Sequence, residues 1–175
     1  MLRLHPRLNP AFYIGLRRYF LTFCTDWRRR WFTKRDVVDP VHAQILHVGI
    51  EMQMEEIAYC FMPDHVHLLV EGCTAGADCP AFVHKAKQRT GFTFAREHGE
   101  RLWAPSFYDR ILRDEDPSLP FIRYIIENPV RAGLVREVED YRFLGSPRYT
   151  IEEVMKVTCR AGLQARPASI AQPAS

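Results

Sequence analysis

The sequence has no apolar run long enough to cross a membrane and no closely spaced pair of cysteines. Residues 1–6 lead into no long apolar segment, and no later stretch approaches the length of a membrane span. The five cysteines are an odd number without a Cys-x-x-Cys pair, so neither a disulfide framework nor a zinc ribbon is indicated. We therefore expect a cytoplasmic protein that is neither secreted nor embedded in a membrane.

Lysine and arginine are also missing from residues 36–84, a segment that holds eight acidic residues. Residues 1–35, in contrast, contain nine Lys or Arg and a single acid, Asp26. The net charge of +3 therefore understates how strongly the charges are segregated along the chain. A basic segment of this kind predicts a polyanionic partner.

The length of 175 residues and the apolar fraction of 47% predict one compact domain with a substantial core. We expect this domain to span residues 1–150. Residues 151–175 are predicted to form a C-terminal tail, largely disordered from about residue 160, because Ala, Pro and Ser dominate its composition.

Hydrophobic periodicity predicts strands and helices that alternate within the domain. The expected strands span residues 17–24, 57–62, 65–71 and 107–112. The expected helices span residues 37–54, 80–98 and 119–128. Up to residue 112, the order strand, helix, strand, strand, helix, strand is typical of a ferredoxin-like α+β fold. We expect an antiparallel sheet with helices on one face, plus an added C-terminal helix that carries Tyr124.

His65 and His67 are separated by one valine in an apolar stretch. Alternate side chains of an extended strand share a face, so both imidazoles point the same way and one metal ion can bridge them. The alternative is a partly exposed strand face whose histidines make ordinary hydrogen bonds. The pair alone leaves both interpretations open.

The helix expected over residues 119–128 follows an Asp-Pro-Ser start signal and is expected to end at Pro129. At about 100° per residue its apolar side chains fill one arc, and Tyr124 and Asn128 form an i, i+4 pair at the edge of that arc. A phenol at this edge can project into a cleft. Alternatively, the tyrosine buries its ring and keeps its hydroxyl in water.

The densest basic cluster follows the first expected strand, in residues 27–35. Guanidinium groups there can bind phosphates while neighbouring aromatic rings stack on unpaired bases. The predicted nucleic-acid contacts in this segment are Arg28, Arg29, Arg30, Trp31, Lys34 and Arg35. A solvated loop whose tryptophans anchor it to the core is an equally open interpretation.

A second basic cluster, Lys85, Lys87 and Arg89, lies on the helix expected after Pro80. Lys85 and Arg89 stand one turn apart on one face of that helix. We predict nucleic-acid contacts for all three residues as well, although such charges often only keep a helix soluble.

Several motifs, taken in order, resemble the REP-associated tyrosine transposases, relatives of the small single-tyrosine insertion-sequence transposases in the HUH nuclease superfamily. The motifs are the histidine-containing run at residues 62–69, residues 103–113, and the run around Tyr124 at residues 123–135. Residues 18–23 also resemble the first strand of that family, so the match extends over about residues 15–147. Agreement of several motifs in order is far more specific than any one of them.

This resemblance implies that His65 and His67 bind Mg²⁺ or Mn²⁺ and that Tyr124 is the nucleophile. Asn128 occupies the place of a polar residue, often Gln in related transposases, that completes the metal site, and its shorter side chain has less reach. The donor set alone would also suit zinc or other transition metals. Tyr108 is the rival nucleophile, but a strand tyrosine more often serves sheet packing, and the resemblance places the nucleophile on the later helix.

The implied activity is metal-dependent nicking and rejoining of single-stranded DNA at hairpin-forming repeats through a 5′-phosphotyrosine intermediate. One alternative is a domesticated protein that binds hairpins without cleaving them. A second alternative, which we do not favour, is a hydrolase of small phosphate esters that uses the histidines alone. The sequence does not decide between a monomer and a homodimer.

Overall fold

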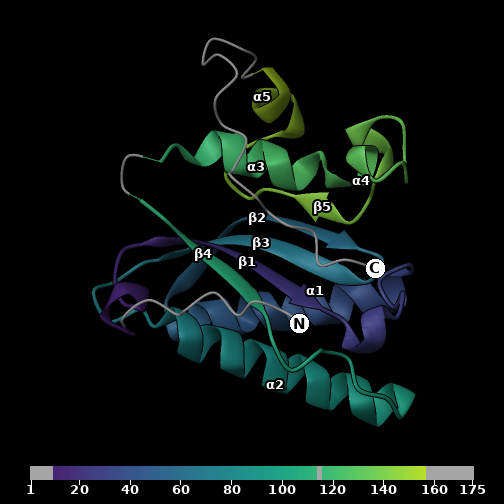
Figure 1. Cartoon of the computed structure of the whole chain (residues 1–175), viewed down its shortest axis with the longest axis horizontal. Coiled ribbons are helices and arrows are strands. Elements are labelled where there is room, and N and C mark those ends of the chain that lie inside the picture. The colour runs from purple at the N-terminus through teal and green to yellow at the C-terminus, as the bar shows by residue number, and fades with distance from the viewer. Residues whose placement is uncertain (1–9, 114–115, 157–175) are drawn as a thin grey trace, which may run out of the picture.

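The fold is described from a computed structural model, which covers residues 10–113 and 116–156. Five strands form one antiparallel sheet in the order β4-β1-β3-β2-β5 (Figure 1). They are β1 (Arg18–Cys24), β2 (Met54–Met62), β3 (His65–Gly72), β4 (Tyr108–Leu112) and β5 (Leu144–Gly145). Together with α1 (Arg35–Met52) and α2 (Cys79–His98), the first four strands follow the predicted chain order. The prediction of a ferredoxin-like α+β fold is therefore confirmed.

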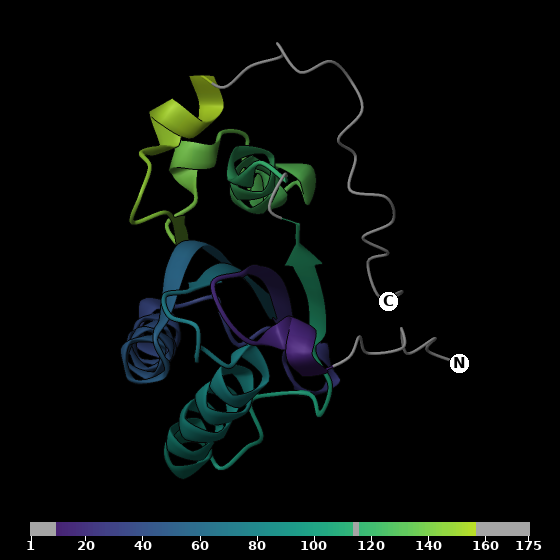
Figure 2. The same cartoon turned by 90° about the vertical axis from the view of Figure 1, so that its left-hand side faces the viewer.

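Helices cover both faces of this sheet. α1 and α2 lie on one face, and three further helices lie on the other (Figures 1 and 2). These three are α3 (Ser118–Ile126), α4 (Asn128–Arg131) and α5 (Ile151–Lys156). Short 3-10 helices are η1 (Pro10–Tyr13), η2 (Asp26–Arg28) and η3 (Val138–Asp140). The added helix that carries Tyr124 is α3, on the face opposite α1 and α2.

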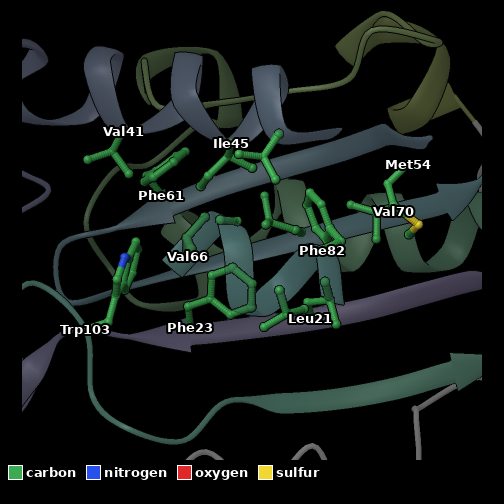
Figure 3. Close-up of a cluster of buried hydrophobic side chains, with 14 of the residues drawn as sticks. Leu21, Phe23, Val41, Ile45, Met54, Phe61, Val66, Val70, Phe82 and Trp103 are labelled. Atoms are coloured by element: carbon green, nitrogen blue, oxygen red, sulfur yellow. The ribbon is translucent and has the colours of Figure 1, made fainter. Parts of the chain in front are cut away.

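The larger core lies between the sheet and the α1/α2 layer. Alternation along the strands points Leu21, Phe23 and Val66 into this layer, where they meet side chains of both helices (Figure 3). Phe82 of α2 is fully buried there. Burial of these large apolar side chains is the main contribution to the stability of the fold.

A second apolar cluster fills the other face. It contains Phe20 and Leu69 from the sheet and Ile122, Ile125 and Ile126 from α3. Because strand residues alternate, the odd-numbered residues of β3 share the face of Leu69. Both histidines of β3 therefore face the layer that holds α3.

The boundaries of two elements differ from prediction. β2 begins at Met54, three residues before the expected strand, and continues through a register shift between Glu56 and Ala58. The expectation that one helix runs to Asn128 and ends at Pro129 is wrong. α3 ends at Ile126, and Pro129 lies in the first turn of α4, where the absent backbone N–H costs little.

The predicted C-terminal tail begins with a helix. α5 lies within residues 151–175 and buries Val154 in the cluster formed with α3. Residues 157–175, which include the part predicted to be disordered, lie outside the described residues. None of the helices in residues 10–113 and 116–156 combines the length and apolar character needed to span a membrane.

Candidate active site

The two histidines of β3 turn one nitrogen each toward a common point. His65 Nε2 and His67 Nε2 lie 3.1 Å apart, and the two ring planes are nearly perpendicular, at 82°. Two ligand atoms about 2.1 Å from one ion and about 90° apart would be separated by roughly 3.0 Å. The observed spacing therefore fits two neighbouring ligands of an octahedral cation.

The opposite nitrogen of each ring is held by a neighbour. His65 Nδ1 lies 2.6 Å from Asp64 Oδ1, and His67 Nδ1 lies 2.9 Å from Thr22 Oγ1 of the adjacent strand. When each Nδ1–H donates to its oxygen, both Nε2 atoms carry lone pairs directed at one another. Such lone pairs need a cation or a shared proton between them, and neighbours that fix the ring in this way are usual behind metal-binding histidines.

Burial reinforces this arrangement. His67 is only 6% exposed, and burial, followed by the proximity of His65, holds the pKa of His67 well below its usual range. Burial would raise the pKa of Asp64, but the hydrogen bond from His65 and the charges of His65 and Arg28 outweigh it and keep that pKa low. His67 is therefore a neutral nitrogen donor, and the ionised carboxylate of Asp64 orients the neighbouring His65.

Tyr124 reaches this histidine pair from α3 within the same chain. Its ring meets Phe20 edge to face at 5.9 Å between centroids and lies 6.3 Å from the ring of His67. Phe20 is also stacked on His67, at 5.4 Å and 24°. The arc-edge position predicted for Tyr124 thus brings a half-buried phenol beside the histidines. Burial raises the pKa of Tyr124, and the charge of Arg131 opposes that rise.

Asn128, the first residue of α4, binds the last turn of α3. It is 7% exposed, and its side-chain nitrogen donates to the carbonyls of Tyr124 at 2.9 Å and Ile125 at 3.4 Å. Only its amide oxygen is left for a metal ion. Within the described residues, no third His, Cys, Asp or Glu joins the histidines in a metal-binding cluster. The assignment of Asn128 as third ligand therefore stays a prediction.

Tyr108, the rival nucleophile, also borders this site. It pairs with Thr22 across the β1–β4 ladder, and its ring meets Phe20 at 6.4 Å. Both tyrosines therefore border Phe20. The sequence reasoning also left out Thr22, Phe20 and Arg131, whose roles depend on contacts between distant segments.

The basic segment after β1, residues 27–35, has only some of its charges available to a ligand. Arg28 pairs with Asp64 at 3.3 Å, and Arg29, although exposed, pairs with Glu100; three other members are exposed as well. These three are Arg30, Lys34 and Arg35. Trp31 packs on Phe94 at 5.0 Å and on His98 at 6.0 Å. For Trp31 the alternative interpretation, a tryptophan that anchors the loop, is the one that the structure supports.

The second basic cluster does not reach the site. α2 lies on the opposite face of the sheet, and Lys85 and Arg89 pair with Glu51 of α1 at 2.7 and 2.6 Å. Lys87 Nζ donates to the carbonyls of residues 104–106 at 2.8–3.3 Å. The predicted DNA contact of these three residues finds no support in their placement, because their charges are engaged within the fold.

Comparisons with known proteins identify the family of this chain. The family described as IS200-like transposases matches residues 15–128, a range that contains both histidines, Tyr124 and Asn128. A Haemophilus influenzae protein named as a REP-associated tyrosine transposase is 29% identical over 140 residues, which cover 71% of this chain and 77% of that protein.

Two solved structures share the fold. The structure of a REP-associated tyrosine transposase bound to a REP hairpin superposes with a TM-score of 0.67 at 21% identity, over 82% of each chain. A Deinococcus radiodurans R1 protein described as a transposase aligns with a TM-score of 0.50 at 20% identity, over 80% of this chain and 97% of that one.

Proposed function

We propose, from the premise that this chain belongs to the IS200-like transposase family, that it nicks and rejoins single-stranded DNA at hairpin-forming repeats through Tyr124. The observation that carries the proposal is the convergence of Tyr124 and His67 on Phe20 within one chain. One of the structural relatives is bound to a REP hairpin, and we extend this kind of partner to the present chain. Because Tyr124 and the histidines meet within one chain, this arrangement supports attack by Tyr124 on DNA bound at the metal site of its own chain.

His65 and His67 would hold a Mg²⁺ or Mn²⁺ ion through their Nε2 atoms, with the amide oxygen of Asn128 as the candidate third donor. A divalent ion bound there supplies polarisation of a phosphate oxygen at the scissile bond. Asp64 and Thr22 keep the two rings turned toward the ion site. The preference for Mg²⁺ or Mn²⁺ over zinc rests on the family resemblance, because two imidazole nitrogens suit either kind of ion.

The reaction transfers a phosphoryl bond. The Oη of Tyr124 loses its proton and attacks phosphorus, and the bond between phosphorus and the 3′ oxygen breaks. The 3′ oxygen takes up a proton as it leaves, so the products are a 5′-phosphotyrosine and a free 3′ hydroxyl. Attack by a 3′ hydroxyl reverses the step and joins strands, with no need for a nucleotide cofactor.

A covalent-adduct assay tests this proposal. Hairpin DNA with a single-stranded extension, labelled on the 3′ side of the expected nick, is incubated with Mn²⁺, and adducts are resolved under denaturing conditions. We expect an adduct with the wild type and none with Tyr124→Phe, whereas Tyr108→Phe, which changes the neighbouring ring on Phe20, keeps it. An adduct that persists in Tyr124→Phe and disappears in Tyr108→Phe would assign the nucleophile to Tyr108.

A second candidate is a hairpin-binding protein without cleavage activity. It is favoured by the exposed cations of the segment after β1 and by the engagement of the Asn128 nitrogen with the backbone. This alternative predicts salt-sensitive binding that survives His65→Ala, together with no adduct from the wild type.

A further inference from the structure

The most exposed aromatic side chain of the described residues is that of Trp27, at 87%. It lies in η2, immediately after β1, whereas the side chains of Trp31 and Trp103 pack against the core. An indole left almost wholly in water contributes nothing to the packing of this domain. The indole is therefore open to contact by a ligand.

The backbone that presents Trp27 has an unusual conformation. Trp27 and Arg28 have φ angles of 52° and 55°, so two successive residues other than glycine occupy the left-handed region. Residues with side chains rarely adopt this conformation, and where it persists it tends to accompany functional sites.

Hydrogen bonds to two other segments of the chain hold the start of this turn in place. The Thr25 N–H donates to the Asp64 carbonyl at 2.9 Å, and the Asp26 N–H donates to the Leu102 carbonyl at 2.8 Å. The Thr25 hydroxyl also contacts the Asp64 carbonyl, at 2.9 Å. The turn is thus fixed to the loop before β3 and to the segment after α2. Trp27 is a preorganised surface group rather than part of a loose loop.

The same turn is connected to the histidine pair. Arg28 Nε lies 3.3 Å from Asp64 Oδ2, and the other oxygen of this carboxylate lies 2.6 Å from His65 Nδ1. Cys24, at the end of β1, also pairs with His65 in the sheet register. The residue that follows Trp27 thus contacts the carboxylate that orients His65, which links the turn to the candidate active site.

We infer that Trp27 is a stacking platform for an unpaired base of the DNA strand that enters the site. The inference rests on the proposed function and deepens it, because it assigns a position for single-stranded DNA. The exposed cations Arg30 and Lys34 lie within seven residues of this indole and suit a phosphate backbone. Exposed aromatic rings combined with nearby cations are what single-strand binding proteins use for sequence-tolerant stacking.

A binding experiment tests this inference apart from catalysis. All variants are made in the Tyr124→Phe background and titrated in EDTA against two fluorescent probes, the hairpin with its single-stranded extension and the same hairpin with blunt ends. Trp27→Ala should bind the extended hairpin about tenfold more weakly and leave the affinity for the blunt hairpin unchanged. Trp27→Phe, which keeps a ring, should retain most of the affinity.

Phe92 offers a matched control, because it is an aromatic residue of α2 that is 63% exposed on the other face of the sheet. Phe92→Ala should bind both probes as well as the parent does. Equal affinity of Trp27→Ala and the parent for the extended hairpin would overturn the inference, and so would an equal loss for both probes. A Trp27 effect in a protein whose wild type makes no adduct would sustain the inference while the proposed nicking activity fails.

Discussion

The guanidinium carbon of Arg131 lies 4.1 Å from the centroid of the Tyr124 ring, although the two residues belong to different helices. The same guanidinium donates a hydrogen bond to the backbone carbonyl of Tyr124 and lies 3.5 Å from the Glu127 carboxylate. A cation over the ring fixes the orientation of the ring. Burial raises the pKa of the Tyr124 phenol, and the charge of Arg131 opposes that rise. Arg131 is therefore a positioning residue for the proposed nucleophile.

We expect Arg131→Ala to slow adduct formation by about tenfold to a hundredfold, since an interaction of roughly 1.4–2.7 kcal/mol with the reacting phenol is removed. Arg131→Lys should lose less, because the charge remains while the planar contact is lost. The measurement is the single-turnover rate of covalent adduct formation. Arg123 pairs with the same Glu127 at 2.6 Å, so Arg123→Ala is the control. Equal slowing in both alanine variants would contradict a specific role of Arg131.

Phe20 supports both reacting partners, because its ring meets those of His67 and Tyr124. We expect Phe20→Leu to destabilise the fold by about 1–2 kcal/mol and, at temperatures where the variant is fully folded, to slow adduct formation severalfold. Phe23 of the same strand is equally buried but faces α2. Phe23→Leu should therefore cost similar stability, measured by denaturant titration, without slowing the reaction. The role of Phe20 would be refuted if both variants had the same rate as the wild type.

The parts of the site that depend on local periodicity could be predicted from the sequence. The shared direction of His65 and His67 follows from the two-residue repeat of a strand, and the position of Tyr124 follows from the helical spacing of its apolar neighbours. Both predictions required only the residues next to these side chains. The structure places them where the repeats indicate.

The remaining parts depend on contacts that local patterns do not encode. Thr22 lies beside His67 only because β1 and β3 pair in that register. Arg131 lies over Tyr124 only because the chain turns between α3 and α4. Trp27 and Trp31 have similar basic neighbours in the sequence. Trp27, which begins a left-handed turn, is exposed, whereas Trp31 packs on Phe94 of α2, and no local pattern distinguishes the two.

Thr22 is expected to control metal affinity through His67. Thr22→Val keeps the shape of the side chain and removes the oxygen 2.9 Å from His67 Nδ1, so the ring loses the contact that orients it. We expect Mn²⁺ to bind about 10- to 100-fold more weakly, as measured by titration of the free-ion electron paramagnetic resonance signal. Thr90 is a buried threonine of α2 that donates to the Ala86 carbonyl. Thr90→Val should leave Mn²⁺ affinity unchanged, and unchanged affinity in Thr22→Val would remove Thr22 from the metal site.

Lys87 is expected to stabilise the fold rather than contact DNA. Its ammonium group donates to three consecutive carbonyls, those of Ala104, Pro105 and Ser106. Lys87→Met keeps the stem but removes the donors, so we expect a loss of about 1–3 kcal/mol in the free energy of unfolding and unchanged affinity for hairpin DNA. Denaturant titration and fluorescence anisotropy at matched folded fractions measure the two quantities.

Arg30 is expected to contact DNA rather than stabilise the fold, because it is an exposed cation of the segment after β1. Arg30→Met should leave the free energy of unfolding nearly unchanged, weaken DNA binding, and reduce the slope of log affinity against log salt by about one. If instead Lys87→Met weakened DNA binding without destabilising the protein, Lys87 would be a phosphate contact. The three carbonyls would then be contacts that the ammonium group gives up when DNA binds.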